Sequence, residues 1–138
     1  MALIAVSHYM DRCWGYLSDT NLPETTSEIT ALRLWIEKLP GVTKAAHRFG
    51  GIEFHVQGLE FMHFHGQTYM DIRLSKEDQA RILNEGKARR HQFAPDAGWV
   101  TLRIDTEKDL ENAREVVQLA YARSKSIMEN HLARRKTQ

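Results

Sequence analysis

The chain has 138 residues, of which 42% are hydrophobic and 27% are charged, and its formal net charge is +1. This length and composition are typical of one globular domain with its own core. The near-zero charge gives no support to a strongly basic nucleic-acid binder or to a membrane-surface protein. The sequence contains one cysteine, which excludes an intramolecular disulfide framework and fits a reducing compartment.

The N-terminal part has the weakest pattern. Its apolar run at residues 2–6 lacks a basic flank and is too short for a signal peptide or a spanning helix, so a cytoplasmic protein without membrane contact is expected. Residues 19–26 are polar and contain a proline, which is typical of a connector. We therefore assign residues 1–26 to an N-terminal segment and connector, residues 27–130 to a single domain, and residues 131–138 to a basic C-terminal tail that is expected to fray.

Three helices are predicted within the domain. The first covers residues 27–39, where Thr25 and Glu28 have the spacing of a capping box and Pro40-Gly41 ends the apolar periodicity. The second covers residues 75–86 and ends at a glycine. The third is the longest and follows a second capping box at residues 106–109.

Three consecutive strands are predicted at residues 52–57, 62–65 and 69–74, with tight turns at Gly58 and Gly66, and a fourth strand at residues 99–104. In each, apolar and polar residues alternate, and successive side chains of a strand point to opposite faces. Strands joined by short turns pair antiparallel, and helices must cover the apolar face. The predicted fold is an α+β two-layer sandwich, a four-stranded mainly antiparallel sheet with helices packed on one face.

The other face of this sheet carries ionisable side chains. His63 and His65 lie on one strand and Asp71 on the next, and neighbouring strands are about 4.8 Å apart, so these side chains are expected to meet. Two imidazoles and a carboxylate are suited to a divalent metal, zinc or iron, as a cofactor. The same three groups and Glu53 are the candidate catalytic residues, since histidine titrates near neutrality and a carboxylate can fix its tautomer. The alternative is a solvated face whose charges form surface salt bridges.

Further candidates for ligand binding surround these groups. Guanidinium groups on or beside the strands would bind a carboxylate or phosphate bidentately. The loop at residues 87–98 would form a rim over one end of the sheet, and its alternative is a turn whose aromatic residues fill the core. The candidate ligand-binding residues are His47, Arg48, His55, Arg73, His91, Asp96, Trp99 and Arg103.

The stretches GVTKAAHRFGGIEF, HFHG, DIRL, HQFAPDAGWVTLRI and LAYAR together resemble the luciferase-domain family. The resemblance runs from about residue 40 to residue 123 and is most specific in HRFGGIEF and PDAGWV. It implies the same fold and supplies no reaction. The end of the domain is also similar to the YjbR-like proteins, whose frataxin-like fold implies DNA binding. The family motif positions are His47, Arg48, Glu53, His63, His65, Asp71, His91, Asp96 and Trp99.

These observations favour a protein that binds a metal or a polar or anionic small molecule on the open sheet face. Hydrolysis or isomerisation would suit the residues, but no nucleophile is evident, so the sequence leaves enzyme activity open. The alternative is a nucleic-acid-binding module of the YjbR-like type, which the near-zero charge disfavours. A third alternative is a homodimer that buries this face, although such interfaces are usually more apolar.

Overall fold

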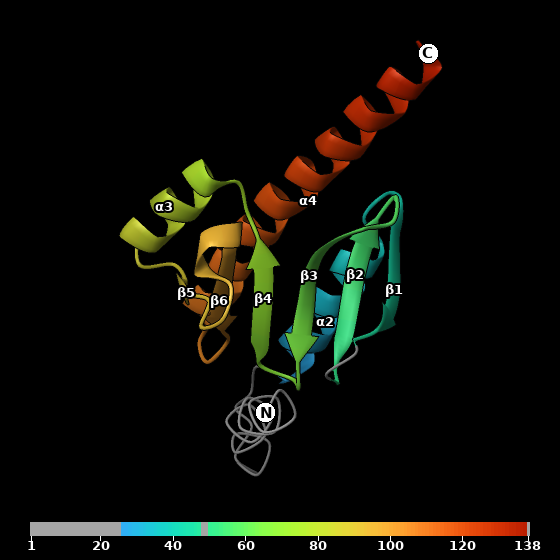
Figure 1. Ribbon diagram of the computed structural model, residues 1–138. Coiled ribbons are helices and arrows are strands. Elements are labelled where there is room, and N and C mark those ends of the chain that lie inside the picture. The colour runs from blue at the N-terminus through green and yellow to red at the C-terminus, as the bar shows by residue number, and fades with distance from the viewer. Residues whose placement is uncertain (1–25, 48–49, 138) are drawn as a thin grey trace, which may run out of the picture.

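The computed structural model describes residues 26–47 and 50–137, so the predicted N-terminal segment up to residue 25 lies outside the described residues. Figure 1 shows one antiparallel sheet with two helices, α2 and α4, on one side of it. In chain order the elements are α2 (Thr26–Glu37), β1 (Val42–Ala46), β2 (Ile52–Val56), β3 (Leu59–His65), β4 (Tyr69–Arg73), α3 (Lys76–Asn84), β5 (Arg89–Arg90), the 3-10 turn η1 (Pro95–Ala97), β6 (Trp99–Arg103) and α4 (Glu107–Lys136).

The sheet has six strands in the order β1-β2-β3-β4-β6-β5, and every neighbouring pair is antiparallel. The α+β class is confirmed, but the predicted number of four strands is wrong. The two additional strands lie at the edges, where β1 pairs only with β2 and β5 pairs only with β6. Both are largely exposed and carry no alternating apolar pattern, so only their backbone pairing identifies them as strands.

The hydrophobic core lies between the sheet and the helices. Phe54, Phe64 and Ile72 point from the strands toward the helices, and Leu32 and Val117 meet them from α2 and α4. All five side chains are at most 2% exposed. Burying a side chain of this size stabilises the fold by about 1.5–3 kcal/mol. This face of the sheet is therefore buried in the core, and the opposite face is the one available to bind a ligand.

The predicted caps at the starts of α3 and α4 are present in the structure. Ser75 caps α3 by accepting a hydrogen bond from the backbone N–H of Asp78. Thr106 and Asp109 form the reciprocal capping box of α4. Thr25, predicted to cap the first helix, lies outside the described residues.

The last helix continues farther than the sequence suggested. It runs to Lys136, so most of the predicted basic tail is helical, and its final turns extend beyond the sheet with every residue from 129 to 137 exposed (Figure 1). Across the described part of the chain, no helix combines the length and the apolar character needed to cross a membrane.

A bulge in β3 changes which of its side chains point to the open face of the sheet. Gln57 and Gly58 form the two-residue turn before this strand, both with positive φ, as a type I′ turn requires. Phe54 then pairs with Met62, but His55 pairs with Glu60, so Phe61 is an extra residue without a partner in the register. This bulge reverses the alternation of the strand at Phe61.

Candidate functional site

The register of the sheet places four polar side chains in one row across its open face. His63 of β3 lies opposite Glu53 of β2 and opposite Asp71 of β4, and Asp71 lies opposite Thr101 of β6. His65 is two residues farther along β3 and points to the same face. Four strands thus contribute to one cluster, which none of them could form alone.

Asp71 is the hub of this cluster. Its Oδ2 atom lies 2.8 Å from Nε2 of His65 and 3.1 Å from Nε2 of His63, and these two nitrogens are 2.9 Å apart. Its Oδ1 atom accepts a hydrogen bond of 2.6 Å from the hydroxyl of Thr101. The carboxylate is only 1% exposed, and His63 and His65 are 7% and 9% exposed. Burial alone would raise the pKa of Asp71, but the hydrogen bonds from the surrounding histidines hold it well below its usual value.

Glu60 is a member of the cluster that the sequence pattern did not indicate. Its Oε1 atom lies 2.7 Å from Nδ1 of His63, three residues along the same strand. Regular alternation would turn Glu60 to the helix-covered face, and the extra residue Phe61 brings it back to the open face. Burial lowers the pKa of His63, but its hydrogen bonds to Asp71 and Glu60 outweigh this effect and raise it to about 9.

His91 contacts Asp71 from the loop between β5 and η1. Its Nε2 atom lies 3.2 Å from Oδ2 of Asp71. Its other nitrogen, Nδ1, accepts hydrogen bonds from the backbone N–H groups of Phe93 and Ala94, at 3.1 and 2.9 Å. Because Nδ1 is an acceptor, the proton of the neutral ring must sit on Nε2. His91 is therefore a hydrogen-bond donor to the carboxylate.

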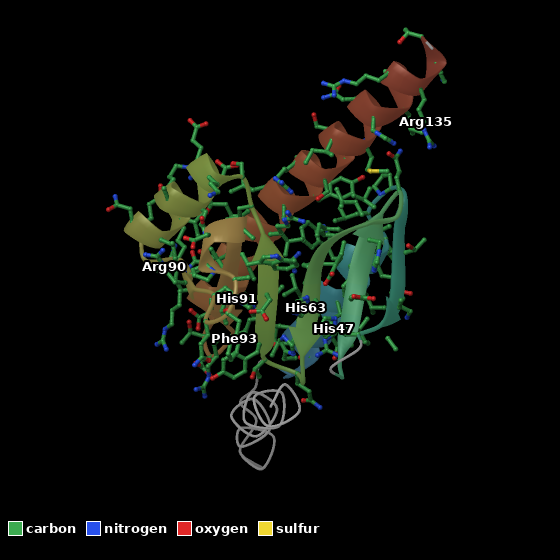
Figure 2. The ribbon with its side chains drawn as sticks, in the orientation of Figure 1. His47, His63, Arg90, His91, Phe93 and Arg135 are labelled. Atoms are coloured by element: carbon green, nitrogen blue, oxygen red, sulfur yellow. The ribbon has the colours of Figure 1, made fainter. Side chains whose placement is uncertain are left out.

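His47 approaches from the opposite side, at the end of β1. Its ring stacks on that of His63 with centroids 4.1 Å apart, and its Nδ1 atom lies 3.2 Å from Oε2 of Glu53. The pKa of His47 is lowered, mainly by burial and also by the charge of His63. Figure 2 shows the labelled rings of His47, His63 and His91 following one another across the front of the sheet.

A glycine permits this approach. Gly51 has a φ of +85°, and a Cβ atom at this position would overlap the backbone carbonyl of Phe64 in β3. The connection between β1 and β2 can pass this close to β3 only because residue 51 has no side chain. His47 also belongs to this connection, since its backbone N–H donates to the carbonyl of Gly51.

Three overlapping sets of groups have the spacing of metal ligands. The donor atoms of His63, His65 and Asp71 are separated by 2.8–3.1 Å. The ring nitrogens of His47, His63 and His65 also lie within 4.8 Å of one another. The third set is His47, Glu53 and Glu60. Every set includes at least one residue of β3, so any ion held here would contact that strand.

The structure places the remaining predicted residues around or away from this cluster. The Trp99 ring is 5.3 Å from the His63 ring, and Nε2 of His55 is 3.4 Å from Oε1 of Glu53. Arg103 pairs with Asp105, and Arg73 donates to the carbonyl of Ala97. Asp96 is exposed in η1, and Arg48 lies outside the described residues.

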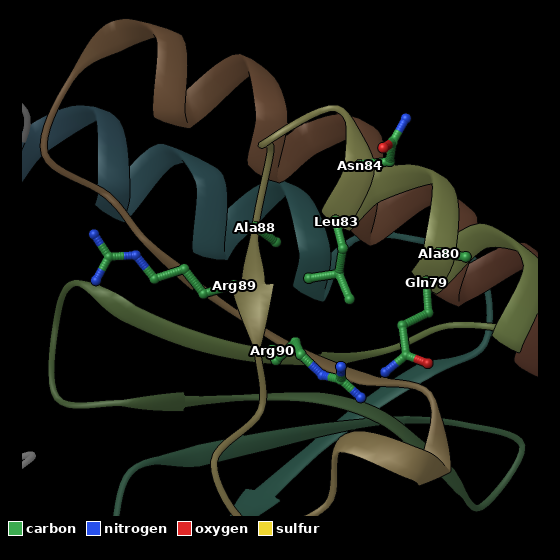
Figure 3. Close-up of a pocket in the computed structure, with 7 residues that line it drawn as sticks. All are labelled: Gln79, Ala80, Leu83, Asn84, Ala88, Arg89 and Arg90. Atoms are coloured by element: carbon green, nitrogen blue, oxygen red, sulfur yellow. The ribbon is translucent and has the colours of Figure 1, made fainter.

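A pocket of about 680 Å³ lies elsewhere, between α3 and β5 (Figure 3). Leu83 and Ala88 give it an apolar wall, and Arg90 lies near Gln79 at its rim. The side-chain amide of Gln79 already donates to the carbonyls of Pro95 and Trp99. No residue of the histidine cluster lines this pocket, so the two features are separate.

Residues 58–120 match the family model described as the luciferase domain. This part of the chain is therefore similar to the luciferase domain. The match confirms the resemblance expected from the sequence, and it extends from the turn before β3 into α4. His63, His65, Asp71 and His91 lie inside the matched segment, whereas His47 and Glu53 precede it. A search of the curated proteins found no match to the chain.

Proposed function

We propose that this protein binds a divalent metal ion, Zn²⁺ or Fe²⁺, through His63, His65 and Asp71. The observation that carries the proposal is the mutual separation of their donor atoms, 2.8, 2.9 and 3.1 Å. Bonds of about 2.1 Å to one ion place neighbouring ligand atoms about 3.0–3.4 Å apart. The three atoms therefore need to move by only a few tenths of an ångström. Two histidines and one carboxylate are also a ligand set used by iron and zinc proteins.

The groups behind these three residues support the same proposal. Glu60 lies on the second nitrogen of His63, which is the arrangement that orients a metal-bound imidazole. Thr101 holds the second oxygen of Asp71. His91 presents an N–H group to the carboxylate, so we assign it a positioning role and exclude it from the ligand set.

Such a centre would serve a polar or anionic small molecule. A metal ion held by three protein ligands keeps coordination positions for water or for an oxygen of the ligand. Metal-assisted hydrolysis and isomerisation are the reaction classes that this arrangement would suit. The protein would contribute the fixed ligand geometry and a largely buried site.

The decisive experiment is the metal content of protein purified without a histidine tag and then offered Zn²⁺ or Fe²⁺ under reducing conditions. We expect about one ion per chain in the parent and none in the His63→Ala/His65→Ala variant. His131→Ala is the matched control, because His131 is exposed on α4 away from the cluster. Equal metal content in the parent and in the double variant would refute the proposal.

A second candidate function uses the same residues without a metal. His63 lies between the carboxylates of Glu60 and Asp71, which favours its charged form and makes it a proton donor or an anion contact. In that case, no metal would be retained by any variant. Binding of a small anion would instead depend on His63.

A further inference from the structure

A second group of metal-ligating side chains lies beside the histidine cluster, where β1, β2 and β3 run next to one another. Donor atoms of His47, Glu53 and Glu60 all lie within 4.8 Å of one another. His47 follows β1, Glu53 belongs to β2, and Glu60 belongs to β3. None of these three residues is a ligand of the proposed metal centre, so they form a separate set on the same open face of the sheet.

The carboxylate of Glu53 lies between two imidazole rings. Its Oε2 atom is 3.2 Å from Nδ1 of His47, and its Oε1 atom is 3.4 Å from Nε2 of His55. Nδ1 of His55 faces the carbonyl of Gly58 at 3.5 Å, so in the neutral ring the proton sits on Nδ1. Nε2 of His55 then carries a lone pair, and this lone pair faces a carboxylate oxygen. Two hydrogen-bond acceptors thus lie side by side without a donor between them.

The second nitrogen of His55 is a further observation that points to a bound cation. In the part of the chain that the structure describes, this Nε2 atom is buried and has no hydrogen-bond partner. A buried polar atom without a partner is costly, and native structures normally pair it with another group. Water held by a cation beside Glu53 would donate hydrogen bonds to both acceptors. The missing group is therefore a hydrated cation.

The proposed metal centre and this second group can each hold an ion at the same time. Nε2 of His63 faces His65 and Asp71, so the first ion would bind at this edge of the ring. Nδ1 of His63, at the other edge, lies 2.7 Å from Oε1 of Glu60. Glu60 therefore orients the ring with one oxygen and keeps its second oxygen for another ion. The two groups share no donor atom.

We infer that His47, Glu53 and Glu60 hold a second divalent cation, Mn²⁺ or Mg²⁺, whose bound water donates to Nε2 of His55. Carboxylate oxygens suit these two ions, which also keep several water molecules when bound. The side chains of Glu53 and Glu60 are 20% and 28% exposed, so this ion is expected to bind more weakly than the first. The inference rests on the proposed function for the first ion, but its own ligands are different residues.

The test is a titration of the full chain with Mn²⁺ after one equivalent of Zn²⁺ has been added, with free Mn²⁺ measured by electron paramagnetic resonance. We expect saturable binding of about one Mn²⁺ per chain. Glu53→Gln and Glu60→Gln should each weaken this binding about tenfold or more, because each removes a charged ligand. Glu111→Gln is the matched control, since it removes the same charge from an exposed residue of α4 that pairs with Lys108, and binding should stay within about twofold.

Melting curves separate loss of binding from loss of folding. Mn²⁺ should raise the melting temperature of the parent and of Glu111→Gln, but not that of Glu53→Gln or Glu60→Gln. Curves recorded without metal show whether each variant is folded, and if Glu53→Gln is not, Glu60→Gln carries the comparison. The inference is overturned if the parent binds no Mn²⁺, or if the folded Glu53 and Glu60 variants bind it as tightly as Glu111→Gln.

The His63→Ala/His65→Ala variant distinguishes this inference from the zinc or iron proposal. It should lose Zn²⁺ and still bind Mn²⁺, because it keeps all three ligands of the second ion. If the folded double variant loses both ions, Mn²⁺ occupies the first centre and the inference is wrong. If the parent holds neither Zn²⁺ nor Fe²⁺ but binds Mn²⁺ in a way that depends on Glu53, only the zinc or iron proposal fails.

Discussion

Replacing Glu60 by glutamine tests the contact that the bulge in β3 creates. The change keeps a hydrogen-bond acceptor near Nδ1 of His63 and removes only the negative charge. His63 has a pKa raised from 6.5 to about 9 in the folded protein, which corresponds to about 3 kcal/mol of stabilisation when the ring is fully charged. Because the folded-state pKa is the higher one, this stabilisation is complete below pH 6.5 and is lost as the pH rises through about 9.

Glu60 is one of the two carboxylates that raise this pKa, the other being Asp71. We therefore expect Glu60→Gln to lower the free energy of unfolding by about 1–2 kcal/mol at pH 7, after allowance for the partial exposure of Glu60. The variant should also lose less stability than the parent between pH 6.5 and pH 9.

The assay is urea unfolding of the metal-free protein at four pH values, with an NMR titration of the His63 ring. Metal must be removed first, because an ion on Nε2 would displace the proton. Glu111→Gln is the control, since Glu111 pairs with Lys108 on the exposed surface of α4 and should change little. If the parent and Glu60→Gln lose the same stability across this range, the reasoning about the bulge contact is refuted.

Three further predictions concern the surroundings of the cluster. Gly51→Ala should destabilise the fold by about 2–4 kcal/mol in urea unfolding, because of the positive φ and the overlap with the Phe64 carbonyl, and a loss below about 0.5 kcal/mol would contradict this packing. Thr101→Val should weaken metal binding about 10–100-fold in a competition assay with a chelator, because Asp71 loses the donor to its Oδ1 atom; unchanged affinity would remove Thr101 from the site. Thr106→Ala should lower stability by about 1 kcal/mol through loss of the cap and leave metal content unchanged, so a change in metal content would count against a purely local effect.

Much of the fold could be predicted from the sequence because most of its elements bury one face. Alternation identified β2, β3, β4 and β6, and the capping residues fixed the starts of α3 and α4. The edge strands β1 and β5 could not be found in this way, since their side chains are largely exposed and only backbone hydrogen bonds define them. The end of α4 was missed for a related reason, because an exposed helix beyond the core needs no apolar stripe.

The candidate site was predicted where it depends on regular alternation. His63, His65 and Asp71 were expected on one face, and the structure places them there. The role of His91 depends on two backbone N–H groups within an irregular loop, which no periodicity reveals. The position of Glu60 on the open face depends on the bulge at Phe61, which no regular alternation reveals. The functional roles of all these residues stay predictions, as does the nucleic-acid-binding alternative.

Phe61 shifts the alternation of side chains in β3 by one residue, so the residues before it and after it alternate out of step with each other. An alignment of this strand with an unbroken strand of another protein would assign either Glu60 or His63 to the helix-covered face. The contact between Glu60 and His63 therefore depends on their spacing of three residues as much as on the identity of the two side chains. A relative that kept both residues but lost one position between them would keep the composition of the cluster and lose the carboxylate beside His63.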